Sequence, residues 1–218
     1  MSFATPRRRI RSIVTAVSLA VVAGLLLAGC ASDPLAAQYL SGDSKNYIAG
    51  DGTVTEIAAE NRKAPVEYKG VSEHGDAISS ADYKGQVVVL NYWYSTCAPC
   101  RAEAPDLAAL STKYEGKGAS FVGVNVRDQA DTARSFAETF KVPYPSIVDT
   151  DGALQLAFTG TVSPNAVPTT LVIDKEGRVA ARILGRVSER SILDTLIHDA
   201  IAEPVAGATP SGTPAAGS

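Results

Sequence analysis

The stretch WYSTCAPCRAEAP, residues Trp93–Pro105, contains two of the three cysteines of the 218-residue chain. It overlaps the end of the run QVVVLNYW (86–93), whose β-branched and aromatic residues predict a strand buried on both faces. Residues 98–114 follow with the periodicity of a helix. We therefore expect Cys97 at the N-cap of this helix and Cys100 in its first turn. Three interpretations are open: a redox couple, half of a metal site, or two buried apolar side chains.

Redox chemistry suits this placement best. A helix N-terminus lowers the pKa of a thiol through its unpaired amide N–H groups and the macrodipole. Pro99 fits the first turn, since its missing N–H would have had no partner there. Cys97 would attack a substrate disulfide, and Cys100 would then attack the mixed disulfide and release the reduced product. A purely structural disulfide is disfavoured, because so short a loop stabilises little.

The other interpretations account for fewer features. A zinc site needs about four Cys or His ligands, and only His74 and His198 could join the pair, at no metal-ligand spacing. Two inert core cysteines would leave the C-x-x-C spacing unexplained. A peroxidase would place an arginine near one cysteine, but Arg101 has a simpler role on a helix face. The sequence therefore predicts no metal site.

Strands and helices alternate on both sides of the cysteine pair, which predicts an α/β fold with a central mixed sheet flanked by helices. In open α/β sheets, sites are built at the carboxyl ends of strands, where the pair is expected. A turn at residues 74–76 should lead into a short strand. The other expected elements are strands at 53–57, 65–68, 86–93, 119–126, 145–148, 169–174 and 178–184, and helices at 98–114, 132–140, 153–158 and from a Ser188 cap to about Ile201.

The two ends of the chain differ from this domain. Residues 1–29 carry arginines and no acid, and their apolar run is typical of a secretory signal peptide and short for a transmembrane helix. LAGC, Leu27–Cys30, resembles a lipobox, so we expect lipid on Cys30 and anchoring to the outer face of the cytoplasmic membrane. An ordinary cleaved secretory peptide is the alternative. The expected divisions are a signal peptide (1–29), a lipid-anchored tether (30–46), one folded domain (47–202) and a disordered tail (203–218).

Charge argues against a nucleic-acid partner. The whole chain has a net charge of −3, with 20 basic and 23 acidic residues. Removal of residues 1–29 would take away four arginines and no acid, which makes the net charge −7. No basic excess then remains to neutralise phosphates. Lipid on Cys30 would have to anchor the protein without help from anionic lipid.

Taken together, WYSTCAPCRAEAP, the preceding VVVLNYW and the later VPTT (167–170) resemble the thioredoxin fold. Over residues 60–201 the chain is similar to the membrane-tethered TlpA/ResA-like thiol–disulfide oxidoreductases, including the CcsX-type proteins of cytochrome c maturation. This resemblance implies a thioredoxin-like fold with an N-terminal β-hairpin extension and a central TlpA-type insertion, here NVRDQADTARSFAETFKVPYPSIVDTDG.

The resemblance also implies roles for individual residues. Cys97 is expected to be the exposed nucleophile and Cys100 the resolving cysteine. Pro168 matches the cis-proline that faces the pair, although an ordinary proline at a strand start is the alternative. Val167 would offer backbone groups to an extended substrate peptide. The expected substrate groove comprises Trp93, Pro99, Val167 and Pro168.

Glu103 lies one helical turn after Cys100, so its side chain can point back toward that thiol. Cytoplasmic thioredoxins have a buried Asp six residues before the first cysteine, where this chain has Asn91, which cannot exchange a proton. In the ResA-like group a Glu at the position of Glu103 takes over as general base. The alternative is a solvated acid near a helix N-terminus. Thr96 departs from the group, whose members usually have Trp there.

The function implied by the resemblance is reduction of protein disulfides, with no cofactor beyond the Cys97–Cys100 couple. Electrons would come from a membrane thiol carrier of the CcdA/DsbD type and pass to the haem-binding C-x-x-C-H of apocytochrome c. A disulfide-forming oxidase for secreted proteins is the alternative, because direction depends on the relative stability of dithiol and disulfide. A non-catalytic copper-binding chaperone is disfavoured, because such relatives use C-x-x-x-C and a distant His.

Overall fold

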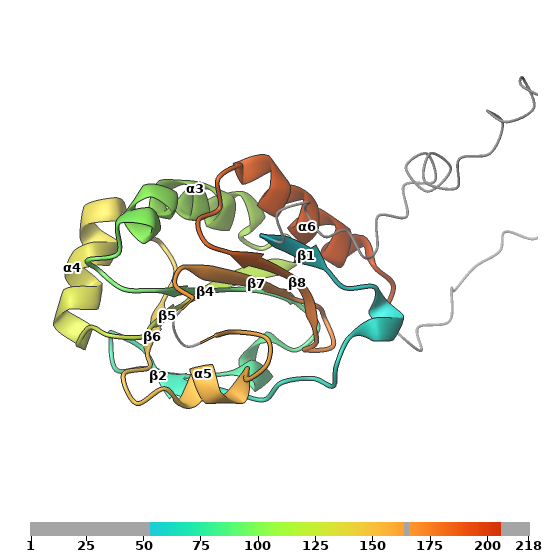
Figure 1. Cartoon of the computed structure of the whole chain (residues 1–218), viewed down its shortest axis with the longest axis horizontal. Coiled ribbons are helices and arrows are strands. Elements are labelled where there is room, and N and C mark those ends of the chain that lie inside the picture. The colour runs from blue at the N-terminus through green and yellow to red at the C-terminus, as the bar shows by residue number, and fades with distance from the viewer. Residues whose placement is uncertain (1–52, 164–165, 206–218) are drawn as a thin grey trace, which may run out of the picture. The chain divides into compact units, whose positions relative to one another are not determined.

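The computed structural model describes residues 53–163 and 166–205 (Figure 1). The expected signal peptide, Cys30 with its tether, and residues 206–218 lie outside the described residues. The expected α/β architecture with a mixed central sheet is confirmed: six strands lie in the order β1-β8-β7-β4-β5-β6. In the described part of the chain, no helix is long and apolar enough to cross a membrane.

The central strand β4 (Val87–Trp93) pairs in parallel with β5 (Ala119–Asn125), which pairs in parallel with β6 (Ser146–Val148). On its other side β4 runs antiparallel to β7 (Thr169–Ile173). The antiparallel part of the sheet continues through β8 (Val179–Leu184) to β1 (Val54–Glu56). The expected N-terminal hairpin is present as β2 (Lys69–Val71) and β3 (Ala77–Ser79).

Helices cover both faces of the sheet. Figure 1 shows α3 (Ala98–Tyr114) and α6 (Arg190–Ala202) on one face, and the short α5 (Ala153–Ala157) with the hairpin on the other. Successive side chains of β4 point to opposite faces of the sheet, so this strand contributes to an apolar core on each face. Val89 packs toward α3 and α6, whereas Leu90 packs toward the opposite face. Helix α4 (Ala130–Phe140) and two 3-10 turns, Ala59–Asn61 and Ser80–Tyr83, complete the elements.

Two local expectations were wrong. The strand expected at 65–68 begins instead at Lys69. Pro65 has no N–H to donate to a neighbouring strand. The Val66 N–H donates to the Gly177 carbonyl, which lies in a turn and not in a strand. The last helix is capped at Glu189 rather than Ser188, with no side-chain cap bond.

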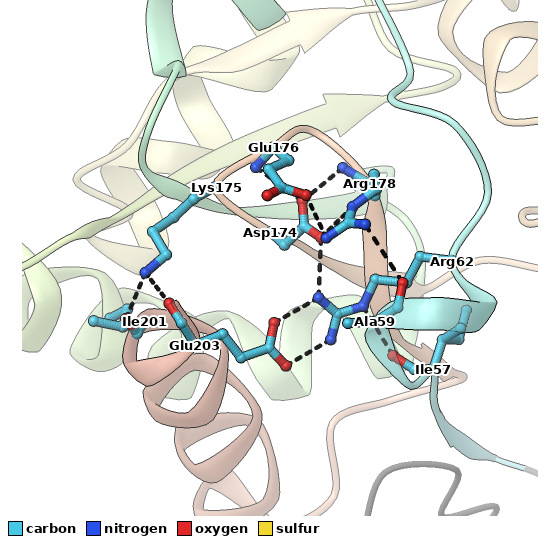
Figure 2. Close-up of polar contacts among 9 residues, drawn as sticks. All are labelled: Ile57, Ala59, Arg62, Asp174, Lys175, Glu176, Arg178, Ile201 and Glu203. Atoms are coloured by element: carbon cyan, nitrogen blue, oxygen red, sulfur yellow. Dashed lines mark hydrogen bonds and ion pairs between the residues drawn. The ribbon is translucent and has the colours of Figure 1, made fainter. Parts of the chain in front are cut away.

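The boundary expected at residue 203 was also wrong, because Glu203 belongs to the folded domain (Figure 2). Its carboxylate accepts hydrogen bonds from both terminal nitrogens of Arg62, at 2.6 and 2.7 Å. Arg62 also donates to Asp174 at 3.0 Å, in the turn between β7 and β8. The Nζ of Lys175 donates to the carbonyl oxygens of Ile201 and Glu203. This cluster, the C-terminal clasp, ties the end of α6 to the start of the domain.

Candidate active site

Cys97 and Cys100 form a disulfide where β4 passes into α3. Cys97 is the N-cap residue, and its Sγ accepts a hydrogen bond of 3.2 Å from the Cys100 N–H. Pro99 lies in the first turn, as the sequence predicts. Both sulfurs therefore lie at a helix N-terminus, where a thiolate is favoured after reduction.

Cys97 is not exposed, contrary to the expectation: only 3% of its surface is accessible. The two cysteines belong to an apolar cluster with Trp93, Ala104, Ala133 and Phe136, which we call the cysteine cluster. The exposed residues nearest in sequence are Thr96, Ala98 and Pro99. Thr96, where members of the resembled group usually have Trp, therefore presents a small exposed side chain next to Cys97.

The Val167–Pro168 peptide bond is cis, so the strand-start alternative with an ordinary trans bond does not apply. Val167 packs on the edge of the cysteine cluster, although it lies 67 residues beyond Cys100. Pro168 is buried, and its carbonyl oxygen accepts a hydrogen bond of 2.9 Å from the Gly185 N–H. The start of β7 is thereby held beside the disulfide.

Trp93 supports the site from inside the domain. Its Nε1 donates to the Ser146 hydroxyl at 3.2 Å, and its ring centroid lies 4.2 Å from that of Phe136. The Trp93 side chain packs closely against Gly123 of the neighbouring strand β5, because a Cβ at that position would lie 2.8 Å from the Trp93 Nε1. Trp93 is therefore a buried wall behind the cysteines, and not an open part of a groove.

Glu103 is 1% exposed, which excludes the solvated alternative. Its Oε1 accepts from the Asn91 Nδ2 at 2.9 Å, and its Oε2 accepts from the Val187 N–H at 2.8 Å. Asn91 also donates to the Thr170 hydroxyl at 3.0 Å. Burial raises the pKa of Glu103 to about 7, and the two hydrogen bonds it accepts oppose that rise only in part. This carboxyl therefore changes protonation near neutral pH.

A cavity of about 10 Å³ lies next to both Asn91 and Cys100, with Tyr144 and Ser146 in its wall. This is about the space that one water needs. Within the described residues, the hydrogen bonds of Glu103 go to Asn91 and Val187 and not to Cys100. Asn91 therefore contacts the Glu103 carboxylate and also lines the cavity next to Cys100.

Sequence reasoning missed the loop that follows β5. The Asp128 carboxylate accepts hydrogen bonds from the Ser95 N–H at 2.6 Å, the Ser95 hydroxyl at 2.8 Å and the Asn125 Nδ2 at 2.9 Å. Ser95 lies two residues before Cys97, so Asp128 fixes the path of the chain into the nucleophile. The spacing Asn125-x-x-Asp128 at the end of a buried strand was the sequence signal for this loop, because Asn and Asp side chains form hydrogen bonds with the backbone of turns.

Among residues 53–163 and 166–205, no group of three or more Cys, His, Asp or Glu side chains could hold a metal ion. The side chains of His74 and His198 are solvent-exposed, on the hairpin turn and on α6.

Comparison with known proteins places this geometry in a family. The Redoxin family model matches residues 59–197. The chain is 34% identical over 97 residues to the thiol-disulfide oxidoreductase ResA of Bacillus subtilis, which covers 44% of this chain and 52% of that protein. It is 33% identical over 96 residues to the thioredoxin-like protein YneN of the same organism, or 43% of this chain and 55% of that protein. The chain thus spans about half the length of the curated relatives it matches.

Solved structures match over a larger share. A secreted thiol-disulfide isomerase from Corynebacterium glutamicum is 32% identical with a TM-score of 0.65, over 72% of this chain and 98% of that one. A DsbF homologue from Corynebacterium diphtheriae is 36% identical with a TM-score of 0.61, over 71% and 98%. The fold is therefore thioredoxin-like, and the chain belongs to the Redoxin family.

Proposed function

We propose that the protein is an extracytoplasmic thiol–disulfide oxidoreductase that reduces disulfides of partner proteins. The observation that carries the proposal is the Cys97–Cys100 disulfide at the N-terminus of α3, beside the cis bond before Pro168. Relatives named as thiol-disulfide oxidoreductases and a thiol-disulfide isomerase support it.

The reaction needs only the two cysteines. In the reduced protein, the Cys97 thiolate attacks one sulfur of the partner disulfide, and the other partner sulfur leaves as a thiol. Cys100 then attacks Cys97, forms the Cys97–Cys100 disulfide and frees the second partner thiol. Two electrons pass to the partner, and the two protons lost by the cysteines end on its thiols. A second dithiol protein must reduce the pair again.

Glu103 supplies the base for the second step in this proposal. Cys100 is buried and must lose its proton before it attacks. The Glu103 carboxylate has a pKa of about 7, which suits proton transfer at neutral pH. A water in the cavity that Asn91 and Cys100 line would carry the proton toward Glu103, the hydrogen-bond partner of Asn91.

The partners follow from the sequence resemblance. We propose the haem-binding C-x-x-C-H of apocytochrome c as the disulfide that is reduced, and a membrane dithiol carrier of the CcdA/DsbD type as the electron donor. Lipid on Cys30 would hold the protein at the outer face of the cytoplasmic membrane, next to such a carrier. Expression with Cys30→Ser should abolish labelling with radioactive palmitate, and labelling that persists would overturn the anchor.

A disulfide-forming oxidase is the second candidate. The likeness to a secreted thiol-disulfide isomerase fits this candidate as well as the first. Both candidates share the exchange chemistry, and only the reduction potential separates them.

A trapping experiment tests the exchange itself. The Cys100→Ser variant should accumulate a mixed disulfide with a disulfide-bonded substrate such as insulin, because Cys97 attacks and nothing resolves the product. The Cys97→Ser variant should accumulate none. Equal trapping by both variants, or by neither, would contradict the assignment of Cys97 as nucleophile.

A further inference from the structure

We propose that Arg101 and Arg127 form a basic rim that binds acidic residues flanking the cysteines of the partner protein. The inference rests on the proposed exchange reaction and specifies its substrate: a peptide segment with carboxylates next to the disulfide.

Arg127 is held beside the nucleophile by an aromatic ring. It is exposed on the loop after β5, and its guanidinium carbon lies 4.1 Å from the centroid of the Tyr94 ring. Tyr94 packs on the cysteine cluster three residues before Cys97. This stacking restrains the guanidinium, and its N–H groups have no hydrogen-bond partner in the part of the chain that the structure describes.

Arg101 is also held by an aromatic ring. It follows Cys100 directly, is exposed, and lies 5.6 Å from the centroid of the Phe140 ring at the end of α4. Phe140 also packs on the edge of the cysteine cluster. Two elements that are distant in sequence thus each place an arginine over an aromatic ring at the border of one site.

Neither arginine is neutralised within residues 53–163 and 166–205, where the ion pairs involve other side chains. Asp128, the acid next to Arg127 in sequence, directs its carboxylate to Ser95 and Asn125. The two free guanidiniums are notable in a chain of net charge −3. They match carboxylates in shape and charge, which makes an acidic peptide the complementary ligand.

The test compares two peptides that each contain one internal disulfide, flanked either by two glutamates or by two lysines. The reduced protein is mixed with each peptide, and its oxidation is followed by the fluorescence of Trp93, the single tryptophan, which packs beside the cysteines. At low salt the glutamate peptide should react about fivefold faster than the lysine peptide, a size expected of exposed ion pairs. The difference should shrink with added salt.

Matched variants separate the rim from general charge effects. Arg101→Gln with Arg127→Gln should abolish the preference, and Lys at both positions should keep part of it. Lys69→Ala with Lys84→Ala removes two positive charges, one from the hairpin strand β2 and one from the segment before β4, and should leave the preference intact. Equal rates for both peptides, or a preference that survives the double Gln change, would overturn the rim.

A redox-free measurement keeps the two proposals apart. The same peptides with serine in place of cysteine are titrated into the oxidised protein, and the amide NMR shifts around Arg127 are followed. Larger shifts with the glutamate peptide would support the rim, whether or not exchange occurs. A failure of exchange would refute the proposed function and not the rim. Absence of any selective shift would refute the rim even if exchange is fast.

Discussion

The side-chain amide of Asn91 donates a hydrogen bond to the Oε1 of Glu103 across 2.9 Å, and thereby joins β4 to α3 one turn beyond the cysteine pair. Asn91 cannot carry a proton, whereas Glu103 can, with a pKa of about 7. In the proposed function the proton-accepting group beside the buried sulfur therefore comes from the helix, while the strand contributes an amide that holds the carboxylate.

Glu103→Gln should slow the second step of exchange and spare the first. When the reduced protein reacts with an aromatic disulfide reagent, attack by Cys97 releases one chromophore and attack by Cys100 releases the other. We expect the second release to slow about 100-fold at pH 7, and its rise with pH through about 7 to disappear. Glu115→Gln, at the exposed end of the same helix, is the control. An unchanged second phase would remove Glu103 from the reaction.

Stability should also depend on pH through Glu103. Its pKa is raised from 4.5 in the unfolded chain to about 7 in the folded one, so the folded state binds the proton more tightly. The free energy of unfolding should therefore fall by about 3 kcal/mol as pH rises from about 4 to 8. Urea unfolding of the oxidised protein measures this. Glu103→Gln should flatten the profile, and a profile as steep as that of the unsubstituted protein would contradict the raised pKa.

Asp128→Ala should loosen the chain that leads into Cys97. The change leaves the Ser95 N–H without the carboxylate that it contacts at 2.6 Å, and we expect a loss of about 2 kcal/mol in the free energy of unfolding. The first phase of exchange should slow as well, because Cys97 is less firmly placed. Asp131→Ala removes an acid that is 88% exposed and paired with Arg134, and should change stability by less than about 1 kcal/mol. Equal effects of the two changes would refute the positioning role of Asp128.

Arg62→Ala should open the C-terminal clasp. The Arg62 side chain is 2% exposed and bonds to two carboxylates, so its removal takes one ion pair from Glu203 and one from Asp174, which keeps its pair with Arg178. We expect a loss of about 3 kcal/mol in the free energy of unfolding. Lys113→Ala breaks an exposed pair with Asp194 and should cost less than about 1 kcal/mol. If the C-terminal clasp does not stabilise the fold, both variants should show the same small loss in the free energy of unfolding.

The parts of the fold that could be predicted from the sequence are those with strong local signals. The run before Cys97 has the continuous apolar character of a central strand, and the helix from Ala98 to Tyr114 was predicted with its observed bounds. The burial of Cys97 could not be predicted, because it depends on Phe136 and Val167 from distant segments. Glu203 was assigned to the tail for the same reason, because its partner Arg62 lies 141 residues away. The composition of the residues after Glu203 gives no sign of this contact.

The same distinction between local and long-range signals applies to the candidate site. Cys97 and Cys100 follow from the C-x-x-C spacing, and the cis bond before Pro168 follows from the family resemblance. The Asn91–Glu103–Val187 contacts, in contrast, join a strand, a helix and a loop. Arg127 and Asp128 fall in the stretch that the resemblance in the sequence identifies as an insertion. Only the fold shows that this loop lies beside the nucleophile.

The reduction potential of the Cys97–Cys100 couple, measured by equilibration of the purified protein with a dithiol buffer, tests the central claim most directly. A reductase of partner disulfides should have a potential at or below that of thioredoxin, about −270 mV. A potential near that of strong oxidants, about −120 mV, would contradict the claim and identify the protein as a donor of disulfides.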